Sequence, residues 1–151
     1  DFEKARFAVA AVFAGALGLP FQLAFTAPGS SPITVLANDT SRCPGAAAHA
    51  GSFEAWVLQT DKAWAANHLR AGTPAEAVAE ELLCELRRLL RTQLPPLQGA
   101  RALQWAYGDG DYGLQGGCAW LPAERLALAG DWCYNGRVEG AWLSGHHAAG
   151  R

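Results

Sequence analysis

Long apolar runs, blocks of like charge and basic surfaces are all missing from this chain. The most extended apolar stretch, Phe7 to Leu19, is interrupted by Gly15 and Gly18 and is too short to cross a bilayer, so we expect no membrane segment. No basic leader precedes this stretch, which favours a cytoplasmic protein. The 12 Lys and Arg residues face 14 Asp and Glu, and the formal net charge of -2 argues against nucleic-acid binding.

Closely spaced metal ligands and a hydrolase centre are missing as well. The cysteines are Cys43, Cys84, Cys118 and Cys133, and they form no CxxC pair and no Cys/His group with zinc spacing. His146 and His147 are neighbours on an expected helix and would point in different directions, so they cannot share a metal ion. We therefore expect reduced, mostly buried thiols and no metal site.

The chain has enough apolar residues to form one hydrophobic core, since half of its 151 residues are hydrophobic. Apolar, β-branched and aromatic residues predict strands over 7–13, 21–25, 33–37, 53–59 and 101–107, and the turn formers at 27–32 predict a hairpin. A helix is expected from about Asp61 to Leu69, with Thr60 or Asp61 as N-cap and Gly72 after its end.

A second helix is expected to begin after Thr73 and to stop before Pro95. Thr73, Pro74 and Glu76 have the spacing of a capping box with proline at the first helical position. Strands followed by helices, then a strand and a terminal helix, favour an α+β fold. Its mostly antiparallel or mixed sheet would be covered by helices on one face.

The richest motif is LALAGDWCYNGRVEGAWLSG, residues 126–145. An apolar strand would lead to Gly130 and Asp131, where a carboxylate can accept hydrogen bonds from sugar-like hydroxyls. A helix would open near Gly136, and its unpaired N–H groups would favour negative charge at the same place. A Gly-Asp pair by itself can also have a purely structural role, as a turn followed by a helix cap.

The whole motif resembles the renalase-like group of FAD-dependent amine-oxidase-like proteins. The resemblance implies that residues 118–151 are the last segment of a Rossmann-like FAD-binding domain and that 1–117 form a substrate domain. Asp131 would contact the ribityl chain of FAD, and the backbone of Arg137 and Val138 would face the N1 and C2 carbonyl edge of the flavin. The implied cofactor-binding residues are Gly130, Asp131, Trp132, Gly136, Arg137 and Val138.

A weaker resemblance to the substrate domain of the same family extends upstream through Asp39 to Arg42 and through the segment around Trp64. It implies that the sheet covers the flavin and that aromatic side chains line a substrate cavity. Trp56, Trp105 and Trp120 are the candidates for these lining residues. A tryptophan is more often part of a core than of a cavity wall, and that alternative stays open for each of them.

The implied reaction is hydride transfer from a reduced nicotinamide dinucleotide, or from an amine, to FAD. We recognise no dinucleotide-binding fingerprint, meaning a GxGxxG run that ends a strand and opens a helix, to hold the ADP half of FAD. The chain by itself is therefore expected to bind FAD weakly and to need an N-terminal FAD-binding half as partner. The alternative is a non-catalytic interaction domain that keeps the substrate-domain scaffold.

Overall fold

The chain folds into two compact units. The computed structural model describes residues 4–42, 52–106, 114, 116–134 and 136–151. The units are Asp1–Tyr107 and Gly108–Arg151, whereas the sequence places its boundary after residue 117. Each unit has its own secondary structure.

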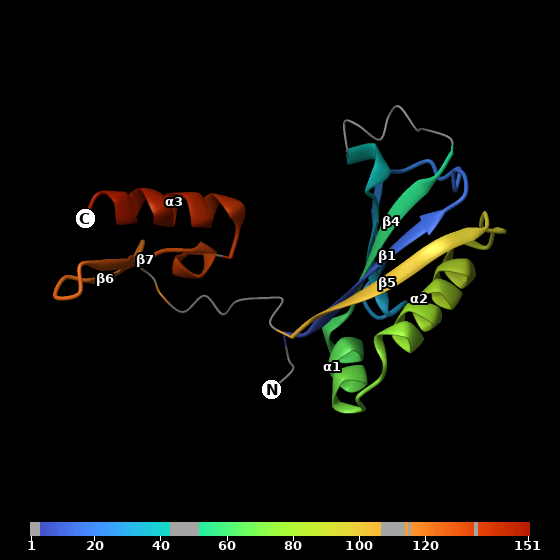
Figure 1. Ribbon diagram of the computed structural model, residues 1–151, viewed down its shortest axis with the longest axis horizontal. Helices are drawn as coiled ribbons and strands as arrows, with labels where there is room; N and C mark the ends of the chain where they lie inside the picture. The colour runs from blue at the N-terminus through green and yellow to red at the C-terminus, as the bar shows by residue number, and fades with distance from the viewer. Residues whose placement is uncertain (1–3, 43–51, 107–113, 115, 135) are drawn as a thin grey trace. The chain divides into compact units, whose positions relative to one another are not determined.

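The first unit is built on a five-stranded antiparallel sheet with the order β2-β3-β4-β1-β5 (Figure 1). The strands are β1 (Arg6–Phe13), β2 (Leu23–Phe25), β3 (Ile33–Asn38), β4 (Glu54–Thr60) and β5 (Leu97–Trp105), and a short 3-10 turn, η1 (Thr40–Arg42), follows β3. The predicted hairpin forms between β2 and β3. β2 and β5 are the edge strands of this sheet, and β1 is the one described strand that pairs with β5.

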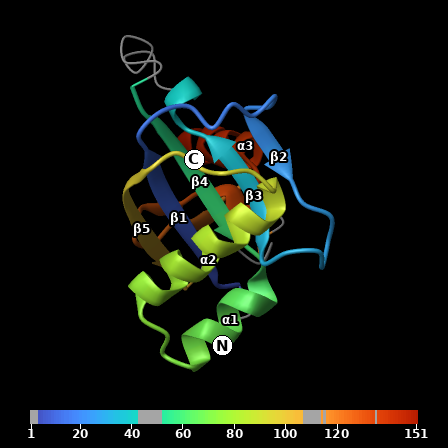
Figure 2. The same cartoon turned by 90° about the vertical axis from the view of Figure 1, so that its right-hand side faces the viewer.

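Two helices, α1 (Lys62–Arg70) and α2 (Ala75–Leu90), cover one face of this sheet (Figures 1 and 2). On α2, Val78, Leu82 and Leu86 recur one turn apart and are fully buried. Burial of each such side chain contributes about 2 kcal/mol. The α+β fold with helices on one face of an antiparallel sheet is thereby confirmed.

The helix-covered face carries the hydrophobic core. Along β1, Phe7, Val9, Ala11 and Phe13 are at most 1% exposed, while the residues between them are not buried. Side chains alternate between the two faces of a strand, so these four all point toward the helices.

The ends of α1 are as the sequence predicts, but the start of α2 is not. The Asp61 carboxylate accepts hydrogen bonds from the N–H groups of Ala63 and Trp64, at 2.9 and 3.1 Å. At α2 the N-cap is Pro74, and no side chain caps the helix. The Thr73 hydroxyl instead lies 3.2 Å from His68 Nδ1. The predicted capping box is therefore wrong, because α1 holds the threonine side chain away from the N–H groups of α2.

The opposite face of the sheet carries no helix of the first unit among the described residues, and we call it the open face. Strand register and alternation place these positions on it: Arg6, Ala8, Ala10, Val12, Leu23, Phe25, Val35, Ala37, Ala55, Val57, Gln59, Gly99, Arg101, Leu103 and Trp105. Several are large, apolar and exposed, with Phe25 at 73% and Trp105 at 56%.

The second unit is small. It consists of a hairpin of β6 (Ala119–Leu121) and β7 (Leu126–Leu128), a 3-10 turn η3 (Asp131–Cys133) and the helix α3 (Val138–Ala149). These elements run from orange to red in Figure 1. β7 pairs with β6 alone among the described strands, so a Rossmann-like sheet around it is not part of the observed fold.

The second unit buries few of its apolar side chains. Among its described residues, Cys118, Cys133 and Ser144 have buried side chains, and Tyr134 meets His147 edge-on at 6.0 Å between ring centroids. Leu121, Leu126, Leu128, Val138 and Trp142 are exposed, Trp142 to 68%. This unit therefore does not bury a core of its own.

Candidate cofactor site

Gly130 and Asp131 follow the C-terminal end of β7, as the sequence predicts. Asp131 begins η3, its side chain is exposed, and its Oδ1 accepts a hydrogen bond from the Trp132 N–H at 3.0 Å. Its other carboxylate oxygen, Oδ2, accepts no hydrogen bond from a described residue. The Asp131 carbonyl oxygen accepts a hydrogen bond from the Gly136 N–H at 3.1 Å. This bond holds Asp131 next to the beginning of α3.

Gly130 has a use that the sequence did not indicate. A Cβ at this position would overlap the pyrrole edge of the Trp132 indole, so only glycine lets the ring lie against the backbone. A glycine at a strand end can also leave space for the close approach of a cofactor. Here the chain's own tryptophan occupies it, so a cofactor would meet the indole of Trp132 rather than the bare Gly130 backbone.

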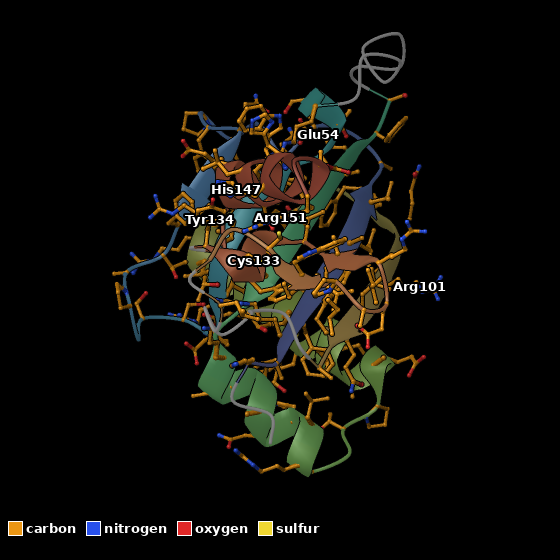
Figure 3. The ribbon with its side chains drawn as sticks, turned by 90° about the vertical axis from the view of Figure 1, so that its left-hand side faces the viewer. Glu54, Arg101, Cys133, Tyr134, His147 and Arg151 are labelled. Atoms are coloured by element: carbon orange, nitrogen blue, oxygen red, sulfur yellow. The ribbon has the colours of Figure 1, made fainter. Side chains whose placement is uncertain are left out.

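Ser144 connects α3 to the strand end. Its hydroxyl is fully buried and accepts a hydrogen bond from the Gly130 N–H at 3.0 Å. Gly140, one turn earlier on α3, is buried as well. The small residues of this helix face thus pack against η3 of the same unit (Figure 3 labels Cys133 and Tyr134 there).

The N-terminus of α3 is open. Gly136 adopts a positive φ of 69°, which turns the chain into the helix, and Arg137 is an extended N-cap without a side-chain cap hydrogen bond. Among the described residues none accepts a hydrogen bond from the N–H groups of Val138 and Glu139, and Val138 is 89% exposed. Such groups carry a partial positive charge and attract an anion.

The six residues assigned to the cofactor therefore lie in one short segment, while two of the three tryptophans assigned to the substrate cavity, Trp56 and Trp105, lie on opposite faces of one sheet. Trp56 is 1% exposed, pairs with Ala11 and belongs to the core. Trp105 pairs with Arg6 and stands on the open face. Trp120 lies on β6 of the second unit. Trp56 and Trp105 thus occupy opposite faces of one sheet, because their partners on β1, Ala11 and Arg6, are an odd number of positions apart along the strand.

A GxGxxG spacing does occur in the sequence, at Gly108, Gly110 and Gly113. These three glycines lie outside the described residues. The element that follows them is the β6–β7 hairpin and not a helix, so the spacing lacks the strand–loop–helix context of a dinucleotide-binding fingerprint.

A comparison with models of known protein families found no match. Within the described part of the chain, no three His, Cys, Asp or Glu side chains come together to hold a metal ion. Nor is any helix of that part both long enough and apolar enough to span a bilayer.

Two pockets are lined by other described residues. One, of about 380 Å³, is lined by His146, His147, Gly150 and Arg151 at the end of α3. The other, of about 300 Å³, lies between the β2–β3 loop, Asp61, Trp64, Glu85 and Arg88. Neither is lined by a residue that the sequence assigns to the flavin.

The second pocket contains a satisfied polar network. Glu85 accepts hydrogen bonds from Arg88 Nε at 2.6 Å and from the Ser31 hydroxyl at 2.6 Å. The hydrogen bond from Arg88 lowers the pKa of the Glu85 carboxyl below its ordinary value, against a smaller opposing effect of burial. The network ties the loop before β3 to α2, and all its members already have partners.

Glu54 is the polar residue that sequence reasoning missed most clearly. Its carboxylate accepts hydrogen bonds from the Trp56 indole N–H at 2.9 Å, the Leu17 N–H at 2.8 Å and Asn38 Nδ2 at 3.3 Å. Glu54 is the first residue of β4, and Figure 3 labels it. Leu17 and Asn38 are far from Glu54 in the sequence, so no local spacing could indicate this hub. It holds Trp56 in the core.

Proposed function

We propose that this chain is the C-terminal part of an FAD-dependent oxidoreductase that accepts hydride from a reduced nicotinamide-type or amine substrate. The observation that carries the proposal is the placement of Asp131 beside the uncapped N-terminus of α3 within one unit. A carboxylate for hydroxyl groups and free N–H groups for a negative edge are what the ribityl and isoalloxazine parts of a flavin require.

The described residues suit one end of the cofactor only. Asp131 Oδ2 would accept hydrogen bonds from ribityl hydroxyls, and the backbone at Arg137 and Val138 would face the N1 and C2 carbonyl edge. The helix start stabilises negative charge at that edge by about 0.3–1 kcal/mol when solvent-exposed, and by more when dry. FAD, when bound, supplies the electron-accepting ring. The ADP half would be held by an N-terminal FAD-binding half, in the same polypeptide or in another chain.

The first unit would supply the substrate-binding surface, and its open face is the candidate for this dry surface. Its apolar strands and the exposed Trp105 support this role, because a dry surface strengthens the electrostatic interactions of a reaction. Hydride transfer needs no side-chain base, so the proposal requires no catalytic acid or base near Asp131. The proposal places the protein in the cytoplasm, where the free thiols Cys84, Cys118 and Cys133 would stay reduced.

Titration of flavin fluorescence tests the proposal. The chain by itself is expected to quench added FAD weakly, whereas the polypeptide extended by the residues encoded upstream should bind it stoichiometrically. In the extended protein, Asp131→Ala should weaken FAD binding by about tenfold or more. The matched control is Glu124→Gln, an exposed acid on the β6–β7 turn, which should leave binding unchanged.

Two outcomes decide against parts of the proposal. Tight, stoichiometric quenching by the chain alone would overturn the need for a partner half. An extended protein that purifies without flavin absorbance and does not take up FAD would overturn the oxidoreductase assignment itself.

A stand-alone interaction domain is the second candidate. The exposed side chains of Val138 and Trp142 lie one turn apart on α3, and the flavin site would use neither of these side chains. Such exposed apolar side chains suit a protein partner. The intact mass of the native protein discriminates between the two: a species of this length without flavin favours the interaction domain, and a longer yellow protein favours the oxidoreductase.

A further inference from the structure

The charge on the open face has one sign. Of its strand positions, only Arg6 and Arg101 bear charged side chains, and none of the described positions carries Asp or Glu. The remaining positions are apolar apart from Gln59 and Gly99. A positive group on an otherwise apolar surface attracts a molecule that is both apolar and negatively charged.

The two arginines differ in their surroundings. Arg6 donates a hydrogen bond to the Thr60 carbonyl oxygen at 3.0 Å. Arg101 lies on the edge strand β5 and is exposed, and its guanidinium forms no hydrogen bond or ion pair with a described residue. Figure 3 labels it at this edge of the sheet. Arg101 is therefore free to bind a ligand.

The neighbours of Arg101 suit a flat ring. On β5 the next open-face positions are Leu103 and Trp105, and the partners of Arg101 and Leu103 on β1 are the small residues Ala10 and Ala8. Leu103 and Trp105 are 43% and 56% exposed. A planar aromatic group can lie over the alanines against these apolar side chains while an attached anion reaches the guanidinium.

We infer that the open face binds a flat aromatic molecule with an anionic substituent, such as a phosphate, carboxylate or sulfonate, and that Arg101 pairs with the anion. That this occupant is the substrate rests on the proposed function. Arg101 then selects against cationic amines, which would meet a like charge and no carboxylate on this face. It is a specificity-determining residue and takes no part in hydride transfer.

Dye binding to the full chain, without flavin, tests the inference. 1-Anilinonaphthalene-8-sulfonate carries a flat naphthalene ring and an anionic sulfonate, whereas Nile red has a flat aromatic ring system and no charge. Arg101→Gln should weaken binding of the sulfonate by about tenfold, because a charge-assisted hydrogen bond is lost. Binding of Nile red should stay unchanged, and Arg101→Lys should retain part of the sulfonate affinity. Salt should reduce sulfonate binding to the native chain more than to Arg101→Gln.

Arg87→Gln is the matched control, since Arg87 is an exposed arginine of α2, on the helix-covered side of the sheet. Equal sulfonate affinity in the native chain and in Arg101→Gln would overturn the inference, as would an equal loss in Arg87→Gln. Because no flavin is present, this failure would leave the FAD assignment standing. Failure of the extended protein to bind FAD would remove the substrate role and leave the dye result intact.

Discussion

At the scale of single residues, Glu85 couples stability to pH. Its carboxyl has a pKa below its ordinary value of 4.5, chiefly because Arg88 donates a hydrogen bond to it. In the unfolded chain this partner is lost and the pKa returns to the ordinary value. The stabilising contribution is therefore present above pH 4.5 and is lost as the pH falls through the lower folded-state pKa.

Glu85→Gln should accordingly reduce the loss of folding stability that occurs at acid pH. Between about pH 6 and about pH 3, the Tm of the native chain should fall by more than that of Glu85→Gln, as measured by circular dichroism. Glu80→Gln, an exposed acid of the same helix, is the control and should follow the native curve. The same loss of stability at acid pH in the native chain and in Glu85→Gln would contradict this role.

At the scale of elements, the two helix starts should respond differently to loss of their oxygen-bearing side chains. Asp61→Ala should lower the free energy of unfolding by about 1 kcal/mol, because Ala63 and Trp64 lose the acceptor for their N–H groups. Thr73→Ala should cost less than half of that, since Thr73 caps no helix. Urea unfolding of the two variants measures the difference, and equal costs would show that Thr73 caps α2 in solution.

The sequence was informative where periodicity is strong. The helical spacing of Val78, Leu82 and Leu86 identifies the buried face of α2. β1 is recognisable as a strand, but it is apolar at both alternating sets of positions, so its core face is evident only in the structure. β5 begins at Leu97 rather than near Arg101, since an edge strand exposed along most of its length has no clear apolar alternation. The capping box failed because Thr73 had a competing partner, His68, that the local sequence does not reveal.

The candidate site was predictable only in part. Gly130, Asp131 and the start of α3 are close in sequence, so the motif itself brings them together. The face on which a strand tryptophan stands depends on register, and this separates Trp56 from Trp105. The packing of Trp132 on Gly130 depends on a turn geometry that no residue type specifies.

At the scale of the whole molecule, the two units should differ in their ability to fold alone. The first unit has a continuous core under α1 and α2, whereas the described side chains buried in the second are few and small. A fragment of residues 1–107 should unfold cooperatively on heating. A fragment of 108–151 should show no cooperative transition, because chains of this size rarely bury enough surface. A sharp calorimetric transition in the shorter fragment would contradict this.

The edge position of β5 also matters for handling the protein. Among the described strands only β1 pairs with its nine residues, so the backbone N–H and C=O groups on the other side can form hydrogen bonds with an incoming strand. Natural sheets guard such edges with charge, and Arg101 is the charged residue of this strand. A substitution that removes this charge should therefore also increase aggregation through pairing of β5 with a strand of another molecule. Preparations of Arg101→Gln are best kept dilute, with light scattering followed alongside every binding measurement.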